Sequence, residues 1–278
     1  MYFYIFDSFT NQPKYAKQIE LIKLRLTDLG IISEKAKASP LQPVELLARE
    51  AILKRKYKNI IAVGGDRTAH IIINEILKAK ENIAFGIIPI GKSNIGDLCG
   101  IPEGINACNI ISARKIVKID LGKLDHMFFS TSLELYFQES NGKKIFEFLN
   151  FFANKNLPEV EIDFRDEEEF EKNFKIKAKT EKIVVANLLP LDTKKVIEKY
   201  TNTKINVSPC DNLLTIFVFT KGRDRRFSVS IFYSKSLRLK SNKPFLCLVD
   251  GQKSKRLSNF VSIKPKALNI IVGKNRQF

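Results

Sequence analysis

The residues whose types and spacing best suit ligand binding form a glycine-rich segment, Gly64-Gly65-Asp66-Arg67-Thr68. It directly follows an apolar run at residues 59–63 and precedes a helical pattern. Glycines at such a turn let the backbone approach phosphate oxygens, and the start of the next helix offers unpaired N–H groups and a partial positive charge. The segment therefore predicts a phosphate-binding loop. The alternative is an ordinary turn in which Asp66 or Thr68 caps the helix.

A second glycine-rich segment, residues 89–97, follows the next apolar run along the chain, residues 84–88. Because the carboxyl ends of parallel strands meet at one edge of a sheet, we expect the two segments to lie side by side there. Together they predict a nucleotide cleft. Its candidate contacts in the second segment are Gly91, Lys92 and Asn94.

Strand and helix patterns alternate through the first part of the chain. Apolar runs predict strands at residues 2–6, 59–63, 84–88 and 115–121. Amphipathic patterns predict helices from about residue 13 to Gly30 and at residues 43–56, 69–78 and 105–113. This alternation predicts an α/β domain with a parallel sheet over residues 1–122.

Strand patterns dominate beyond residue 122. They predict a β-rich, β-sandwich domain over residues 123–278, whose last strand can return to the first domain. The predicted strands include residues 227–231, residues 243–249 with the hairpin pair Asp250-Gly251, and residues 267–272. Helical patterns at residues 143–154 and 191–200 interrupt this domain.

Composition restricts the class of protein. The formal net charge of +17 favours anionic partners, although a lysine-rich solvated surface explains the charge equally well. The four cysteines show no C-x-x-C spacing, so neither a metal site nor a disulfide framework is expected. No apolar run approaches the ~20 residues that span a bilayer. We expect a cytoplasmic protein, at most peripheral to the inner membrane surface, and a homodimer is compatible with the sequence.

The two loops resemble motifs of the diacylglycerol and sphingosine kinase type of lipid kinase, whose fold is similar to that of NAD kinases. That family has G-G-D-G-T, then P-x-G-T-x-N-D-x-A, then L-G-I-P. The matching residues are Gly64, Gly65, Asp66 and Thr68 in the first motif, Pro89, Gly91 and Asn94 in the second, and Gly100-Ile101-Pro102 in the third. Later segments are also similar, at residues 119–122, 249–252 and 265–272.

This resemblance implies an ATP-dependent lipid kinase that phosphorylates a hydroxyl of diacylglycerol or a related lipid, with Mg²⁺ neutralising phosphate charge. It implies nucleotide binding by the first loop, including Arg67, and by Gly91, Lys92 and Asn94. It also implies a general base at Asp250. Asp211 lies in a segment similar to a shortened P-x-A-x-x-D-G and is a candidate metal ligand. Nucleotide and a lipid at a membrane surface are the implied partners.

Several positions depart from the family pattern. Arg67 replaces the third glycine of the first motif, and its guanidinium can either clamp a phosphate or fill the space of the nucleotide. Lys92 replaces a threonine, and Ile95 replaces an aspartate. Gln252 stands where the family has glutamate, and an amide cannot act as a general base. These changes favour an alternative, a catalytically inactive relative that binds nucleotide or phosphate in a regulatory role. Nucleic acid is not an expected partner, because no recognised module is present.

Overall fold

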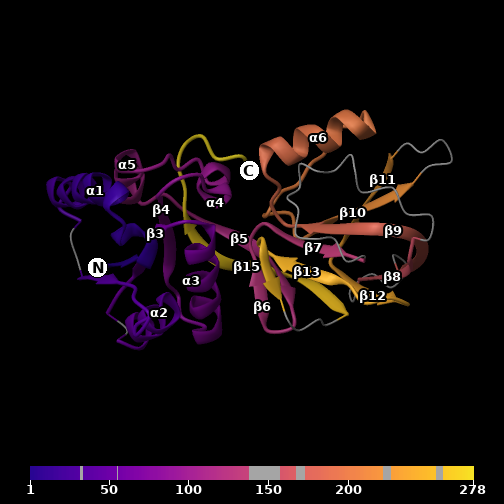
Figure 1. The fold of residues 1–278 in the computed structure, drawn as a ribbon, viewed down its shortest axis with the longest axis horizontal. Coiled ribbons are helices and arrows are strands. Elements are labelled where there is room, and N and C mark those ends of the chain that lie inside the picture. Colours follow the sequence, from indigo (N-terminus) through magenta and orange to yellow (C-terminus); the bar gives the residue numbers. More distant parts are fainter. Residues whose placement is uncertain (32–33, 55, 138–156, 167–172, 222–226, 255–258) are drawn as a thin grey trace. The chain divides into compact units, whose positions relative to one another are not determined.

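The computed structural model describes residues 1–31, 34–54, 56–137, 157–166, 173–221, 227–254 and 259–278 (Figure 1). The chain divides into two compact units. Unit 1 consists of Met1–Asp120 and Pro265–Phe278, and unit 2 of Leu121–Lys264. The sequence placed the division after residue 122, and in the structure the chain passes between units within β5 (Ile116–Leu124) and β15 (Phe260–Ile271).

Unit 1 is built on a parallel sheet. Its strand order is β15–β4–β3–β1–β2, and every pair in this series is parallel. The strands are β1 (Tyr2–Phe6), β2 (Glu34–Lys37), β3 (Asn59–Gly64) and β4 (Ala84–Pro89). Since Gly64 pairs with Pro89 in register, the two glycine-rich loops begin at neighbouring strand ends.

Helices cover both faces of this sheet (Figure 1). One face carries α1 and α5, and the other carries α2 and α3. Every residue of β3 and β4 is buried, which explains why both strands read as continuous apolar runs. The helices are α1 (Ala16–Asp28), α2 (Val44–Leu53), α3 (Asp66–Ala79), the short α4 (Asn94–Leu98) and α5 (Ile105–Ala113).

The C-terminal residues return to unit 1 beside the third family motif. The N–H of Gly273 donates to the carbonyl of Cys99 at 2.8 Å, and that of Gln277 to Leu98 at 3.0 Å. Gly100 has a φ of +67°, and a Cβ there would lie 2.5 Å from the backbone nitrogen of Arg276. This position therefore requires glycine for both conformation and space.

Unit 2 is rich in antiparallel strands. The pairs run in the order β14–β13–β7–β9–β8–β12–β15, and β10 pairs with β9 and β11. The elements are β6 (Met127–Phe129), β7 (Ser132–Tyr136), β8 (Glu159–Arg165), β9 (Phe174–Ala186), α6 (Leu191–Thr201), β10 (Leu214–Lys221), β11 (Phe227–Ser234), β12 (Ser236–Ser241), β13 (Leu246–Val249) and β14 (Gln252–Ser254).

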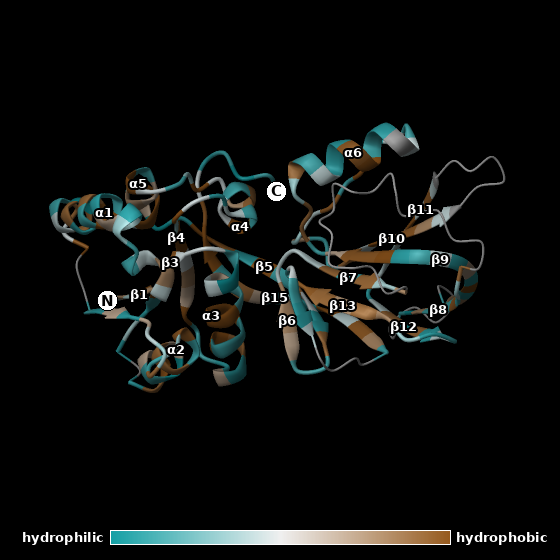
Figure 2. Cartoon of the chain, in the orientation of Figure 1, coloured by the Kyte–Doolittle hydropathy of each residue, from teal (hydrophilic) through white to brown (hydrophobic). Residues whose placement is uncertain are grey.

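Successive side chains point to opposite faces of these strands, and the apolar ones form two separate clusters. Leu133 and Leu135 of β7 belong to the larger cluster. Val184 of β9 and Phe217 of β10 belong to a smaller one, together with Ile197 of α6. Figure 2 shows mainly hydrophobic residues along β7 and β10 and a mixture of hydrophilic and hydrophobic residues along α6. An amphipathic helix covering one sheet face accounts for that mixture.

The predicted fold class, an α/β N-terminal region with parallel strands followed by a β-rich part, is confirmed. Helix α3 begins at Asp66, three residues earlier than predicted, because Gly65 is its N-cap. The closing strand begins at Phe260 instead of residue 267. The predicted helix at residues 143–154 lies outside the described residues. Within the described part of the chain, no helix has the length and apolar character to cross a membrane.

Candidate functional site

The first glycine loop joins β3 to α3 and has one crowded glycine and one open glycine. A Cβ at Gly64 would lie 2.7 Å from Oγ1 of Thr68 and 3.1 Å from Cβ of Asp7. A Cβ at Gly65 would meet no atom within 4 Å. Gly64 thus allows three segments to pack closely. Gly65 leaves space above the start of α3, where the first helical N–H groups lack intrahelical partners.

Asp66 joins the two glycine loops. Its carboxylate accepts hydrogen bonds from Oγ of Ser93 at 2.5 Å, from the N–H of Asn94 at 2.9 Å and from the N–H of Ile95 at 3.2 Å. The expectation that the loops lie side by side is therefore confirmed. Asp66 lies in the first turn of α3, and its carboxylate stabilises the beginning of α4. We did not predict this role from the sequence.

Ser93 reinforces this junction. It is the N-cap of α4, and its Oγ accepts a hydrogen bond from the N–H of Gly96 at 3.0 Å. We did not predict this role of Ser93 from the sequence. A serine placed just before a short apolar helical segment is a capping signal, and it could have revealed this role.

The loop after β1 is also tied to the first glycine loop. Thr68 is fully buried and donates from Oγ1 to Oδ2 of Asp7 at 2.5 Å. Asp7 caps the short 3-10 helix at Ser8–Asn11 by accepting from the N–H of Phe9 at 3.2 Å. The hydroxyl hydrogen of Thr68 is therefore committed to Asp7, and its predicted role as a phosphate donor requires a change of partner.

Three predicted contact residues are exposed along the same edge of unit 1. Arg67 begins α3, while Lys92 and Asn94 stand in the second loop. Gly91 has a φ of +83°, and its N–H donates to Oε1 of Glu103 at 2.9 Å. The edge thus combines two cationic side chains with the N-terminus of α3, an arrangement that attracts anions.

Asp250 lies in the hairpin turn between β13 and β14 in unit 2. Only 8% of the residue is exposed, and its backbone has a φ of +46°. One carboxylate oxygen accepts from the N–H of Ser130 at 3.0 Å and from its Oγ at 3.3 Å. The other accepts from the N–H of Thr131 at 2.8 Å, its Oγ1 at 2.7 Å and the N–H of Ser132 at 3.3 Å.

These five contacts occupy the Asp250 carboxylate. An ionised carboxylate offers about four lone-pair sites, so no acceptor capacity is left over in this arrangement. The hairpin turn itself was predicted correctly. The contacts with the segment before β7 were not, because they join residues about 120 positions apart in the sequence.

Asp211, the candidate metal ligand, is exposed in unit 2. Its Oδ1 accepts a hydrogen bond from the N–H of Leu213 at 3.0 Å, which is the geometry of an aspartate-stabilised turn. Among the described residues there is no group of three or more His, Cys, Asp or Glu side chains that could hold a metal ion.

One partly buried polar cluster in unit 2 was not predicted from the sequence. Lys182 donates from Nζ to Oε2 of Glu134 at 2.7 Å and to the hydroxyl of Tyr136 at 2.9 Å. The Tyr136 hydroxyl donates to the same glutamate oxygen at 2.6 Å. Burial raises the pKa of Tyr136, and the Glu134 charge raises this pKa further. The alternation Leu133-Glu134-Leu135-Tyr136 places both polar residues on one strand face and was the available signal.

Comparison with known proteins finds a family model that matches the N-terminal part of the chain. Residues 2–124 match the model of the diacylglycerol kinase catalytic domain. The chain is similar to this family over these residues, which are less than half of its length. The match includes both glycine loops, the strands that precede them and the helices that follow them.

Curated relatives of this family match the same part of the chain. A diacylglycerol kinase from Staphylococcus haemolyticus is 34% identical over 118 residues, covering 40% of this chain and 36% of the relative. One from Staphylococcus saprophyticus is 33% identical over 118 residues, again covering 40% of this chain and 39% of the relative. The match thus spans well under half of the length of these curated relatives.

Solved structures extend the likeness in fold to nearly the whole chain. A diacylglycerol kinase structure from Bacillus anthracis has a TM-score of 0.75 at 16% identity, covering 99% of this chain and 97% of that chain. A putative diacylglycerol kinase from the same organism has a TM-score of 0.76 at 15% identity, covering 98% and 97%. At these identities the likeness shows the fold of both units. It does not show which reaction the residues of this chain carry out.

Proposed function

We propose that this protein is an ATP-dependent lipid kinase. It transfers the γ-phosphoryl group of ATP to a hydroxyl of diacylglycerol or a related lipid. The observation that carries the proposal is the pair of glycine loops at one edge of the unit 1 sheet, within the residues that match the model of the diacylglycerol kinase catalytic domain. Phosphoryl transfer requires mainly positioning and charge stabilisation, which suits a site made of backbone N–H groups and cations.

The nucleotide phosphates bind, in this proposal, above Gly65 at the N-terminus of α3. The absence of any atom within 4 Å of a Cβ at Gly65 supports this placement, because phosphate oxygens need close access to the backbone. Arg67 and Lys92 supply positive charge from the two loops, and Asn94 supplies an amide. Asp66 acts chiefly by holding the loops together through Ser93 and the backbone of α4.

Mg²⁺ in such a site is typically held by one or two carboxylates together with substrate phosphates. Asp66 fits the role of a single carboxylate ligand, since its three hydrogen bonds leave about one lone-pair site. When bound, the ion neutralises charge on the transferring phosphoryl group. Asp211 remains a proposed ligand from unit 2, with one oxygen engaged by Leu213.

Asp250 remains the proposed general base that accepts the proton of the lipid hydroxyl. To do so, it must exchange one of its five donors for the substrate. The longest of the side-chain contacts is that of the Ser130 hydroxyl at 3.3 Å. We therefore propose that the lipid hydroxyl replaces Ser130 Oγ on this carboxylate oxygen, while the three backbone N–H groups continue to orient Asp250.

A labelled-phosphate assay tests the activity. The purified protein is incubated with γ-labelled ATP, Mg²⁺ and diacylglycerol dispersed in anionic vesicles, and the lipids are separated by thin-layer chromatography. We expect labelled phosphatidic acid from the wild type and from Lys17→Gln, an exposed control on α1, and much less from Gly65→Ala when ATP does not saturate the protein. Absence of product from several hydroxyl-bearing lipids would overturn the kinase proposal, and saturable ATP binding in that case would point to a non-catalytic nucleotide-binding role.

A further inference from the structure

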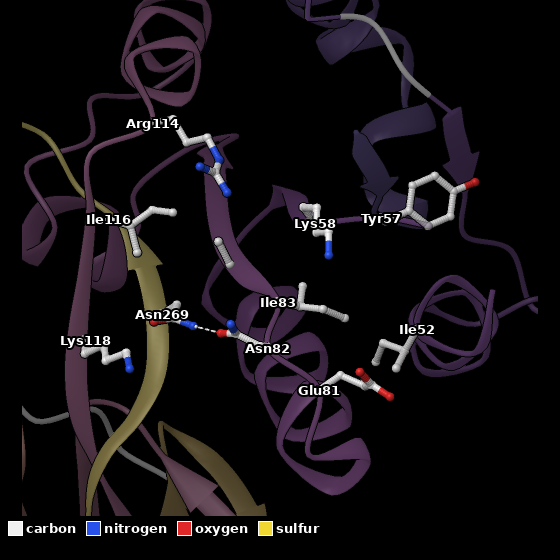
Figure 3. Close-up of a pocket in the computed structure, with 11 residues that line it drawn as sticks. Ile52, Tyr57, Lys58, Glu81, Asn82, Ile83, Arg114, Ile116, Lys118 and Asn269 are labelled. Carbon is white, nitrogen blue, oxygen red and sulfur yellow. Dashed lines mark hydrogen bonds between the residues drawn. The ribbon is translucent and has the colours of Figure 1, made fainter. Parts of the chain in front are cut away.

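A cavity in unit 1 lies at the opposite end of the sheet from the glycine loops. It is next to the first residues of β3 and β4, whereas the loops follow their last residues. Its volume is about 350 Å³, within the range of small-molecule sites. Figure 3 shows the side chains that surround it, including Lys58, Glu81, Asn82, Arg114, Lys118 and Asn269.

Arg114 is held in a defined orientation beside this cavity. It ends α5 in the left-handed region with a φ of +49°, a conformation that is uncommon for a residue other than glycine. Its Nε donates to Oδ1 of Asn59 at 2.8 Å, and Asn59 is only 2% exposed. Anchoring at Nε leaves the two terminal nitrogens of the guanidinium as donors, and this fork matches phosphate oxygens.

Two asparagines that line the cavity are hydrogen-bonded to each other. Asn269 of β15 donates from Nδ2 to Oδ1 of Asn82 at 2.6 Å, as the dashed line in Figure 3 indicates. Because this bond uses the Asn82 oxygen as an acceptor, the Asn82 amide nitrogen keeps its role as a donor. The contact thus presents a further N–H group to a ligand.

The charges around the cavity favour an anion. Lys58, Arg114 and Lys118 contribute three positive charges, and Glu81 contributes the single negative charge among the lining residues. All four side chains belong to exposed residues, so a ligand can reach them from solvent. A planar guanidinium, two ammonium groups and an amide donor form a set suited to a phosphate group, which has oxygens on several sides.

We propose that this cavity binds the phosphate group of an anionic molecule, separately from the glycine loops. The phosphate is carried either by a soluble phosphomonoester or diphosphate or by an anionic lipid headgroup. The proposal does not depend on the kinase activity, because none of its residues belongs to the two glycine loops.

A site-specific titration tests the proposal. Inorganic pyrophosphate is added to ¹⁵N-labelled full-length protein while the side-chain amide signals of Asn82 and Asn269 are followed by NMR. We expect saturable shifts of both signals in the wild type. In the double variant Lys58→Gln/Lys118→Gln, the affinity reported by these signals should fall at least tenfold.

A matched control removes the same charge elsewhere in unit 1. The variant Lys17→Gln/Lys35→Gln changes two exposed lysines of α1 and β2 that do not line the cavity, and it should bind as the wild type does. Circular dichroism and thermal melting establish that both double variants are folded. Arg114→Lys preserves the positive charge but removes the guanidinium fork. It should therefore weaken binding although the net charge is unchanged.

Sedimentation with phosphatidylglycerol vesicles distinguishes the two sources of phosphate. Pyrophosphate shifts lost in the cavity variant assign a soluble phosphate ligand. Vesicle binding that falls in the cavity variant but not in the control, without pyrophosphate shifts, assigns a lipid headgroup. If the Asn82 and Asn269 signals ignore pyrophosphate and vesicle binding is equal in both double variants, the proposal is wrong.

Discussion

Asp66 of unit 1, at the start of α3, and Asp250 of unit 2, in a hairpin turn, both follow a strand, and both accept hydrogen bonds from backbone N–H groups. Asp66 accepts three hydrogen bonds and lies next to Gly65, around which there is open space. Asp250 accepts five and is 8% exposed. The Asp66 carboxylate therefore holds together an accessible edge of the unit 1 sheet. The Asp250 carboxylate is instead enclosed by the Ser130–Ser132 segment, whose position it fixes. Removal of the carboxylate should therefore destabilise the protein more at Asp250 than at Asp66.

The largest effect is expected for Asp250→Ala. This change leaves five donors in a buried region without their acceptor, so it should lower the free energy of unfolding by about 4 kcal/mol. Denaturation by urea, followed by far-ultraviolet circular dichroism, measures the loss. A loss below about 1 kcal/mol would contradict the view that Asp250 orders the Ser130–Ser132 segment.

Asp250→Asn is the matched variant for function. An asparagine keeps one oxygen acceptor and tolerates the left-handed backbone at this position, so the loss of stability should be smaller, about 1–2 kcal/mol. It cannot accept a proton. If Asp250 is the general base, labelled phosphatidic acid should disappear in this folded variant, and unchanged turnover would exclude that role.

Asp66→Ala should have the next largest effect. It removes the acceptor for Ser93 and for the first N–H groups of α4, at a cost of about 2 kcal/mol, comparable with the loss of a strong helix cap. Arg67→Ala, one residue later and exposed, is the control and should change the unfolding free energy by less than about 0.5 kcal/mol. Equal destabilisation by the two variants would contradict the bridging role of Asp66.

The two adjacent glycines separate packing from access. Gly64→Ala would bring a Cβ within 2.7 Å of Thr68 Oγ1 and should destabilise the protein by about 1–3 kcal/mol. Gly65→Ala meets no atom within 4 Å at an ordinary φ of −113°, so its melting temperature should match that of the wild type. Thermal melting of the two variants in parallel checks this difference, and a destabilised Gly65→Ala would contradict it.

The smallest effect concerns the thiols of the two units. Burial raises the pKa of Cys99 in unit 1 and of Cys247 in unit 2 to about 12 each. Cys210 is the exposed cysteine, so a thiol reagent should modify one group rapidly in the native protein and four after unfolding. Since the unfolded thiols ionise near their usual pKa of 9.0, stability should fall as the pH rises above that value.

The sequence reveals the first unit better than the second for a physical reason. The residues that form each glycine loop are contiguous in the sequence, and buried parallel strands produce clear apolar runs such as residues 59–63. Strand β2 was missed because its residues Glu34–Lys37 lie at the sheet edge and carry no apolar pattern. In unit 2, the partners of Asp250 lie about 120 residues away, and no local pattern signals such a pairing.

Titration of ATP into wild-type protein and Gly65→Ala tests the central claim most directly, namely that nucleotide phosphates bind above Gly65. Calorimetry in the presence of Mg²⁺ measures both affinities, and thermal melting verifies that the folds are equally stable. We expect saturable binding by the wild type and at least a tenfold weaker affinity in Gly65→Ala, because the added methyl group occupies the space of a phosphate oxygen. Equal affinities in two equally stable proteins would contradict the account.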